Sequence, residues 1–286
     1  MIAKTEFFDL EEPKIQKDEI LIVKDEYFHP KNVAIVTGAA SGIGRATAIA
    51  LAVNGLTVIG NDVVVEGGKK TAKMAKDLGG KVIFIKTDLT KDAEIEDCVR
   101  QASQYGDIKF LANIAGLQHI NSIEDFPMEK YDLMQTIMLR APFYLSKLCI
   151  PHMKKSEAGT GAIGNMSSVH GHMVTRNKPV YNITKFGLRG LAQSIAAEGG
   201  GKIRGFTISV GFVRTPLALN QVPDQALQRG ITPEEVVKDV MLGRSQIKEM
   251  MTPVEVANLY VIGFSSLGKY LIGGDLLFDG GMVKTY

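Results

Sequence analysis

The sequence predicts an α/β fold in which a doubly wound parallel β-sheet is covered by helices on both faces. Short apolar segments of strand length alternate with segments of helix length from residue 31 onwards. The first of these strands runs directly into a Gly-rich turn, "TGAASGIG", that opens a helix. No linker, repeat or shift of composition divides residues 31–286 of this 286-residue chain. We therefore expect one domain over that range.

The elements follow one another in a regular order. Strands are expected at "NVAIVTG", "LTVIGND", "KVIFIKTD", "IKFLANIAG", "GAIGNMSS", "IRGFTISVG" and "GGDLLFDGG". Helices are expected at "GIGRATAIALAVNG", "EGGKKTAKMAKDLGG", "DAEIEDCVRQASQYG", 127–153 and 181–198, with further helical segments over roughly 215–265. Right-handed crossovers between parallel strands put helices on both faces, and ligands then bind at the carboxyl ends of the strands.

Residues 1–30 differ from the rest of the chain. They carry eight Asp and Glu residues against four Lys and Arg residues, and Pro30 closes the segment. The stretch "EILIVKDEYF" favours a short strand. We interpret residues 1–30 as an N-terminal extension that lies on the surface or contacts another subunit, with a disordered tail as the alternative.

The composition excludes several classes of function. A formal net charge of +2, without basic clusters, gives no electrostatic basis for binding nucleic acid. Apolar runs are interrupted well before the roughly 18 residues that a membrane span needs. The first residues lack an apolar signal-peptide core. Cys98 and Cys149 form no metal or redox motif, so we expect two buried thiols in a cytoplasmic protein.

The glycines of "TGAASGIG" are spaced to hold a dinucleotide. Gly38 allows a tight exit from the strand, Gly42 allows a diphosphate to approach backbone N–H groups, and Gly44 lets the helix pack on the sheet. The helix N-terminus favours the negative charge, and Ser41 adds a hydroxyl donor. A merely structural turn is the alternative. In its strand–turn–helix setting, the motif indicates a Rossmann-like cofactor site.

An aspartate after the second strand supports that interpretation. Asp62 follows Gly44 by eighteen residues, near the roughly 20-residue offset at which an acid binds the adenosine ribose hydroxyls. A carboxylate there repels a 2′-phosphate, so the expected cofactor is NAD rather than NADP. A solvated turn residue is the alternative for Asp62. Asp88 is expected at the adenine edge, with a helix N-cap as its alternative.

Three residues offer acid–base chemistry. Tyr181 and Lys185 are four residues apart, which puts them on one face of a helix near its N-terminus. A nearby ammonium group and the positive end of a helix both stabilise phenolate, so we expect the pKa of Tyr181 to fall towards neutrality. Ser168, on the strand upstream, is placed to hydrogen-bond the same substrate oxygen.

Together these residues resemble the short-chain dehydrogenase/reductase family. The resemblance covers residues 31–286 through "TGAASGIG", "NIAG", Ser168, Tyr181-x-x-x-Lys185 and the late "DGG". It implies that Tyr181 exchanges a proton with the substrate, that Lys185 lowers the tyrosine pKa and holds the nicotinamide ribose, and that Ser168 polarises the substrate oxygen. It also implies further NAD contacts from Ile43, Leu89, Asn113, Gly116, Gly211, Val213 and Thr215.

Two positions depart from the family pattern. Val210 replaces the usual proline before Gly211, which is a minor change. Met138 stands where the long helix usually carries an asparagine that shapes a water-relay site. A thioether cannot replace that amide, so proton relay is slower, takes another route, or leaves catalysis impaired.

Several stretches are similar, within that family, to the D-3-hydroxybutyrate dehydrogenases. They are "AGLQHINSIEDFPMEKYD", "SSVHGHMVTRNKPVYNITKFG" and "VRTPLALNQ". The similarity implies that a small carboxylate is held by Gln118, His170, Lys178 and Gln221, and that residues near 215–250 form a mobile helical lid. Ordinary loop or surface roles are the alternative for each. His170 and His172 hint at a metal, but without further ligands at suitable spacing we expect none.

The sequence therefore predicts an NAD-dependent enzyme that interconverts D-3-hydroxybutyrate, or a similar short 3-hydroxy acid, and acetoacetate. One alternative is a family member for another small alcohol, sugar acid, steroid or 3-oxoacyl thioester. Another is an NAD(H)-binding protein with little catalysis, which Met138 suggests. The family resemblance also implies a homotetramer. Nucleic acid and membrane partners are not expected.

Overall fold

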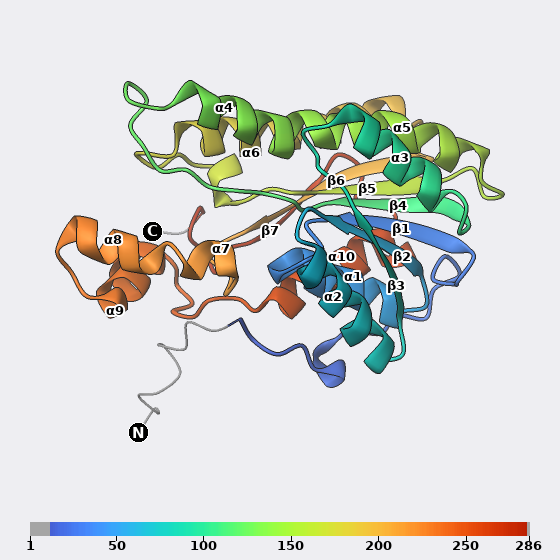
Figure 1. Ribbon diagram of the computed structural model, residues 1–286, viewed down its shortest axis with the longest axis horizontal. Coiled ribbons are helices and arrows are strands. Elements are labelled where there is room, and N and C mark those ends of the chain that lie inside the picture. Colours follow the sequence, from blue (N-terminus) through green and yellow to red (C-terminus); the bar gives the residue numbers. More distant parts are fainter. Residues whose placement is uncertain (1–11, 285–286) are drawn as a thin grey trace.

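The computed structural model describes residues 12–284 and contains a seven-stranded, fully parallel sheet with helices on both faces (Figure 1). The strand order is β3-β2-β1-β4-β5-β6-β7. The strands are β1 (Asn32–Thr37), β2 (Thr57–Asp62), β3 (Lys81–Lys86), β4 (Asp107–Asn113), β5 (Gly161–Met166), β6 (Ile203–Val210) and β7 (Asp275–Phe278). The expected doubly wound, single-domain α/β fold is confirmed.

Helices cover the sheet in two layers (Figure 1). The α-helices are α1 (Gly42–Val53), α2 (Val65–Asp77), α3 (Asp92–Ala102), α4 (Met128–Gln135), α5 (Ala141–Lys155), α6 (Pro179–Glu198), α7 (Pro216–Leu219), α8 (Val222–Arg229), α9 (Pro233–Glu235) and α10 (Pro253–Phe264). The short turns are η1 (Lys17–Glu19), η2 (Thr136–Arg140), η3 (Val169–Gly171), η4 (Val236–Met241) and η5 (Ser266–Gly268). Helices α1, α2 and α10 cover one face, and α3 to α6 the other.

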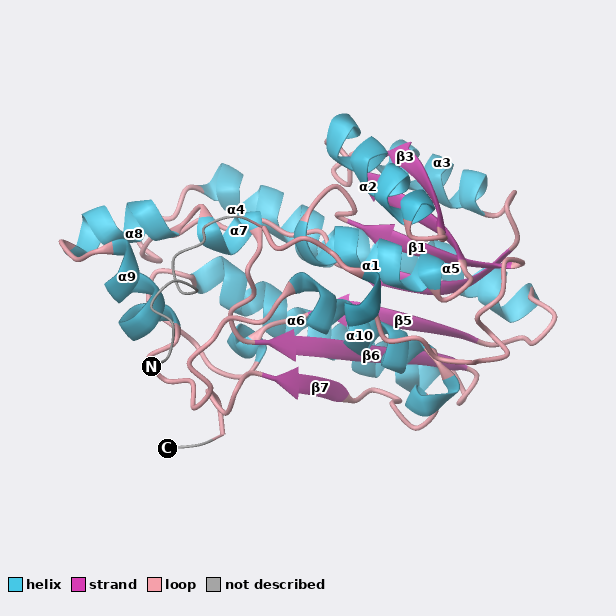
Figure 2. Ribbon diagram, turned by 90° about the horizontal axis from the view of Figure 1, so that it is seen from below, coloured by secondary structure: helices cyan, strands magenta, loops and turns pink. Residues whose placement is uncertain are grey.

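The strand order reverses between β1 and β4, which is where a doubly wound sheet opens a crevice. Ala34 of β1 is paired with Val58 of β2 on one side and with Phe110 of β4 on the other. From β1 the chain continues outward through β2 to β3, and from β4 it continues to the other side through β5, β6 and β7. Figure 2 shows β5, β6 and β7 on the opposite side of β1 from β3. The crevice therefore lies at the carboxyl ends of β1 and β4.

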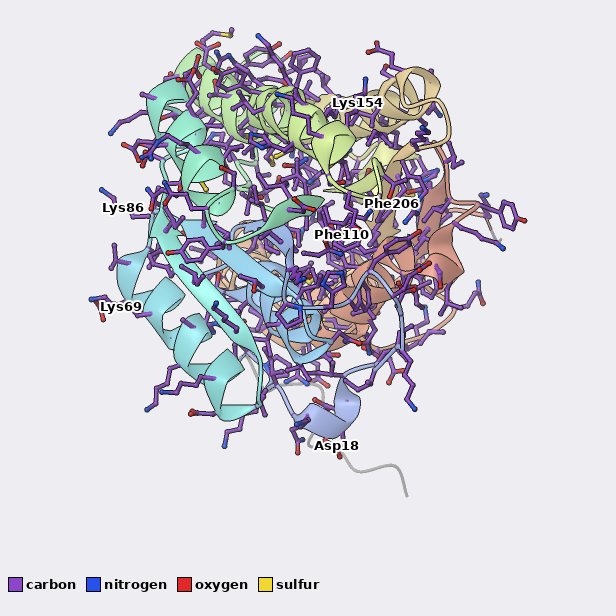
Figure 3. All side chains as sticks on the ribbon, turned by 90° about the vertical axis from the view of Figure 1, so that its right-hand side faces the viewer. Asp18, Lys69, Lys86, Phe110, Lys154 and Phe206 are labelled. Atoms are coloured by element: carbon purple, nitrogen blue, oxygen red, sulfur yellow. The ribbon has the colours of Figure 1, made fainter. Side chains whose placement is uncertain are left out.

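Aromatic side chains fill the core beneath α10. Phe110 stacks on Phe264 with ring centroids 4.9 Å apart, and Phe206 meets Phe264 edge-on at 5.5 Å. Gly263 makes room for Phe206, because a Cβ there would lie 2.5 Å from the Phe206 ring. Figure 3 shows Phe110 and Phe206 inside the molecule, while Lys69, Lys86, Lys154 and Asp18 extend outward from its periphery.

The first described residues, 12–30, form an arm that packs along α1 and α10. The expected short strand is wrong, because this segment pairs with no strand in the part of the chain that the structure describes, residues 12–284. Instead the N–H groups of Leu21 and Val23 donate to the side-chain oxygens of Asn258 and Asn54. Ile20 and Phe28 of the arm are buried in the core. The rest of the predicted extension, 1–11, lies outside the described residues.

Two helical regions are less regular than expected. The long helix predicted at 127–153 is a continuous path of α4, η2 and α5, in which η2 is a π-helical turn. Such turns are rare and occur often at functional sites. The region 215–265 is divided into α7, α8, α9, η4 and α10. Within residues 12–284, no helix is long and apolar enough to cross a membrane.

Candidate active site

A cavity of about 410 Å³ lies at the carboxyl ends of the strands and extends beneath α7 and η4. It brings together nearly all the residues that the sequence singles out for binding or chemistry. Those that line it are Gly38, Ser41, Gly42, Ile43, Gly44, Asp62, Asp88, Leu89, Gly116, Gln118, Ser168, His170, Lys178, Tyr181, Lys185, Gly211, Val213, Thr215 and Gln221. Asn113 does not line it, because its amide turns between the strands and donates to the Asn165 side chain at 2.8 Å.

The glycine turn forms a backbone cradle along one wall. Gly38 and Gly42 have φ values of 71° and 53°, a region that residues with a Cβ rarely adopt. A Cβ on Gly44 would lie 2.0 Å from the Gly38 carbonyl, so the helix reaches the turn this closely only with glycine. Across the cradle, Thr215 lies 3.1 Å from where a Gly42 Cβ would stand. The open cradle and the helix N-terminus behind it fit a dinucleotide diphosphate.

Asp62 and Asp88 stand at the ends of neighbouring strands. The Asp62 carboxylate accepts hydrogen bonds from the N–H groups of Ala40 and Val64 at 3.1 and 2.9 Å. Asp88 accepts from the Thr90 hydroxyl and N–H, which holds the pKa of this carboxyl below its usual range. Asp88 does not cap α3, whose N-cap is Lys91. Both carboxylates line the cavity.

Ser168, Tyr181 and Lys185 meet at the opposite wall. Pro179 occupies the first turn of α6, where its missing N–H costs no hydrogen bond, so Tyr181 lies in that turn. The Lys185 ammonium nitrogen lies 5.1 Å from the Tyr181 ring centroid and donates to the Met166 carbonyl at 2.7 Å. The i, i+4 spacing therefore places Tyr181 and Lys185 on one face of α6, and both residues line the same cavity as Ser168.

The expected lowering of the tyrosine pKa is wrong for the site in this state. Burial raises the pKa of Tyr181 to about 12, and a hydrogen bond with Ser168 only partly offsets that rise. Burial also lowers the pKa of Lys185 to about 7. A lysine that loses its proton near neutrality exerts little stabilisation on a phenolate, so desolvation outweighs charge here.

His170 orients the serine hydroxyl. Its Nδ1 lies 3.2 Å from Ser168 Oγ, and its Nε2 lies 2.9 Å from the Thr175 hydroxyl. Burial lowers the pKa of His170 to about 3, with Lys178 and Lys185 adding to the effect, so the ring is neutral. A neutral ring donates through one nitrogen and accepts through the other. The site therefore contains a chain of hydrogen bonds from Thr175 through His170 to Ser168, whose hydroxyl lowers the pKa of Tyr181.

The other predicted substrate residues, Gln118, Lys178 and Gln221, line the same cavity. Among the side chains that the structure describes, which exclude those of 224 and 228, no acceptor or carboxylate bonds the Lys178 ammonium group, and burial followed by the charge of Arg229 lowers its pKa. Gln118 has a buried side-chain oxygen without a partner among the same residues. The Gln221 amide donates to the Leu217 carbonyl within the helical segment above the cavity. The cavity thus contains polar groups to which a bound ligand can hydrogen-bond.

Met138 lies in the π-turn η2 and is buried. Its sulfur lies 3.4 Å from where a Cβ of Gly116 would stand, and it packs with Met134 and Val180 beside Tyr181. The position therefore supplies apolar packing behind the tyrosine rather than a polar group.

Two contacts around the site could not be predicted from the sequence. Thr175 has no motif, because only the fold brings it to His170. His172, considered above for a metal, instead lies 2.6 Å from the Asp275 carboxylate of β7. Asp275 also accepts from the hydroxyls of Thr207 and Ser209. Alternating hydroxyls on β6 are a signal of this cluster that a pattern search can detect.

Comparisons with known proteins agree with this geometry. A family model described as "Enoyl-(Acyl carrier protein) reductase" matches residues 38–283. D-beta-hydroxybutyrate dehydrogenase from Rhizobium meliloti (strain 1021) is 35% identical over 254 residues, which cover 87% of this chain and 97% of that protein. D-beta-hydroxybutyrate dehydrogenase from Cupriavidus necator is 34% identical over 252 residues, covering 87% and 97%.

Solved structures show the same fold. A crystal structure of a putative NAD(P)-dependent gluconate 5-dehydrogenase from Beutenbergia cavernae, with bound NADP at low occupancy, has a TM-score of 0.80 and 24% identity. The match covers 91% of this chain and 100% of that one. The family model over most of the length, together with relatives above 30% identity, shows that the chain belongs to the short-chain dehydrogenase/reductase family.

Proposed function

We propose that the protein is an NAD-dependent oxidoreductase that interconverts D-3-hydroxybutyrate, or a similar short 3-hydroxy acid, and acetoacetate. The observation that carries this proposal is the Lys178 ammonium group, which lines the same cavity as Tyr181 and has no bonded acceptor or carboxylate among the described side chains, which exclude those of 224 and 228. A half-buried cation without a counter-ion is stabilised by a ligand that supplies the negative charge. The D-beta-hydroxybutyrate dehydrogenase relatives support the same substrate class.

The cofactor is proposed to lie along the glycine cradle. Gly42 and Ile43 would hold the diphosphate, Asp62 the adenosine ribose, and Thr215 the carboxamide end. A bound nicotinamide supplies the acceptor or donor of hydride at the substrate carbon. Leu89, Gly116, Gly211 and Val213 complete the proposed walls, and Asn113 would act from below through Asn165.

Tyr181 is proposed to move the proton. In the reduction its hydroxyl gives a proton to the developing alkoxide, and in the oxidation its phenolate takes one. Ser168 donates to the same oxygen, while His170 holds the serine hydroxyl in position. Lys185 has a pKa of about 7, so about half of these ammonium groups keep their proton at neutral pH. The protonated form of Lys185 stabilises the phenolate of Tyr181.

The Lys178 ammonium group and the Gln118 amide N–H groups are proposed to hold the substrate carboxylate. Gln221, between α7 and α8, is proposed to cover the bound carboxylate. A full positive charge and neutral donors are what a short carboxylate needs once water is excluded. The residues from α7 to η4 therefore serve as the lid in this proposal.

The preference for NAD rests on Asp62. Its carboxylate faces the cavity at the end of β2, where it would repel a 2′-phosphate. The related gluconate 5-dehydrogenase structure contains NADP, so cofactor choice varies among proteins of this fold. For this chain we propose NAD.

We also propose a homotetramer in the cytoplasm. Phe143, Ile183 and Phe186 are exposed on α5 and α6, and such apolar residues are typical of a surface that meets another subunit. Cys98 and Cys149 are buried free thiols, as suits a reducing compartment.

A panel of steady-state assays tests the proposal. Each enantiomer of 3-hydroxybutyrate, a sugar acid, a steroid alcohol and a 3-oxoacyl thioester is offered with NAD or NADP and the matching reduced cofactor. We expect the highest kcat/KM for D-3-hydroxybutyrate with NAD. A higher value for the thioester or steroid would replace the substrate, and preference for NADP would refute the role of Asp62. Tight NADH binding without turnover would favour the non-catalytic alternative that Met138 raises.

A further inference from the structure

The N-terminal arm reaches the start of the cofactor helix. The Glu12 side chain accepts a hydrogen bond from the N–H of Gly42, the first residue of α1, and pairs with Arg45 at 2.9 Å. Both side chains are largely shielded, at 20% and 9% exposure. In Figure 1 the arm, in blue, runs below α1 and α10 and ends on the side where α7 lies.

Gly42 belongs to the cradle that faces the cavity. The first N–H groups of a helix have no partner within the helix and carry its positive end charge. Glu12 already occupies one of these donors, while within residues 12–284 no acceptor bonds the N–H of Ile43 or Gly44. The same helix end therefore holds an internal anion and two open donors.

Arg45 lies in the first turn of α1, and Glu12 pairs with it. Its guanidinium also donates to the Ala40 carbonyl and to the Thr71 hydroxyl, so it stays in place whether or not Glu12 is bound. Glu12 thus lowers the positive potential at the cradle in two ways, by occupying a helix donor and by pairing with a fixed cation.

The rest of the arm is anchored independently of Glu12. Leu21 and Val23 are bonded to Asn258 and Asn54, and Ile20 is buried. The segment from residue 12 to η1 makes fewer such contacts: Ile15 packs against the core and the Glu19 carbonyl accepts from Asn258, but the side chains of Lys17, Asp18 and Glu19 are exposed. The Glu12 end can therefore leave α1 while the remainder of the arm stays docked.

We propose that Glu12 is an internal competitor at the cofactor site: its carboxylate weakens binding of the dinucleotide phosphates, and dinucleotide binding in turn loosens the Glu12 end of the arm. This inference rests on the proposed binding of a dinucleotide at the cradle. Two anions at one helix terminus repel each other, and the coupling between them is reciprocal. Glu12 is thus an affinity-setting residue that neither touches the substrate nor takes part in the chemistry.

Titration of NADH fluorescence with the full chain tests the inference. Glu12→Gln keeps the size of the side chain and removes its charge, whereas Asp18→Asn removes a charge from the same arm at an exposed position. We expect Kd for NADH to fall by about two- to fivefold in Glu12→Gln, the scale of one charge at a helix N-terminus, and to stay unchanged in Asp18→Asn. An equal or weaker affinity in Glu12→Gln overturns the inference.

Hydrogen exchange supplies the reciprocal measurement. The Gln16 amide donates to the Glu19 side chain and should exchange faster in wild-type protein saturated with NADH, while the bonded amides of Ile20, Leu21 and Val23 stay protected. Unchanged or slower exchange at Gln16 contradicts the coupling. If wild-type protein binds no NADH, the proposed function fails; if it binds NADH and Glu12→Gln leaves Kd unchanged, the inference alone fails.

Discussion

The two halves of the cavity recognise their ligands by different means. The half built from β1, β2 and α1 offers backbone N–H groups, positive-φ glycines and one strand-end carboxylate. The half built from η3, α6 and α7 offers side chains, several of them with pKa values displaced by burial. Backbone recognition follows from a local turn, whereas the side-chain half depends on groups that tertiary packing brings together and desolvates.

This difference separates binding from chemistry. Apart from Lys185 and Thr215, which are proposed to contact the nicotinamide half of the cofactor, removing a functional group from the side-chain half should change turnover or substrate affinity and leave dinucleotide binding nearly intact, since the cradle is backbone. The comparison fails wherever a substitution at Ser168, His170, Lys178 or Tyr181 weakens NADH binding as strongly as it weakens catalysis.

Tyr181→Phe should have the largest effect. Loss of the phenolic proton donor should lower kcat by about 10²- to 10⁴-fold, the usual contribution of general acid–base catalysis. The ring and its packing beside Met138 are retained, so the fold should persist. Steady-state rates and NADH titration on the same samples check both halves of the expectation.

Retention of more than a tenth of the wild-type kcat would assign proton transfer to another group. A parallel loss of NADH affinity would instead show that the two halves are not separable.

Lys178→Gln should have the next largest effect. Removing the charge that faces the carboxylate should lower kcat/KM for 3-hydroxybutyrate by about 10- to 100-fold, because hydrogen bonds to charged groups contribute about 1.5–3 kcal/mol. The loss should appear mainly as a higher KM. Rates over a range of substrate concentrations measure it.

Arg176→Gln is the matched control for that substitution. Arg176 is an exposed cation two residues away and does not line the cavity. Equal losses in the two variants would mean that general surface charge, and not a specific contact with Lys178, attracts the substrate.

Residue spacing is enough to predict the backbone half. The sequence places Gly38, Gly42 and Gly44 in a strand–turn–helix context, and a local turn of that kind needs no long-range information. The order of strands and helices could be predicted for the same reason, because periodicity and turn residues are local properties. The arm shows the limit: its apolar residues suggested a strand, but Asn54 and Asn258 satisfy its N–H groups instead.

The electrostatics of the side-chain half could not be predicted from spacing. The i, i+4 relation brought Tyr181 and Lys185 together, but the direction of their pKa shifts follows from burial that only the packed structure defines. Thr175 and Glu12 were missed because each acts across a tertiary contact, on His170 and on Gly42. Residue roles assigned through family resemblance stay predictions until the variants are measured.

The smallest expected effect is on the pH dependence of the unfolding free energy, and it concerns His170 in the side-chain half. His170 has a pKa of about 3 in the folded protein against 6.5 for an ordinary histidine. Between those values the unfolded chain binds a proton that the folded protein does not, so the unfolding free energy falls as pH falls through this window. The full contribution of neutral His170 is present above pH 6.5, and the loss amounts to about 1.4 kcal/mol per pH unit at most.

His170→Gln removes this titration and retains a side chain that can hydrogen-bond Ser168. Urea unfolding of both proteins at several pH values from 4 to 8 gives the difference in unfolding free energy, in which the carboxylates common to both cancel. We expect wild-type protein to lose stability more steeply than the variant below pH 6.5, and the two slopes to agree above it. Parallel curves across the whole range would mean that His170 accepts a proton in the folded state, and the neutral chain from Thr175 to Ser168 would then be wrong.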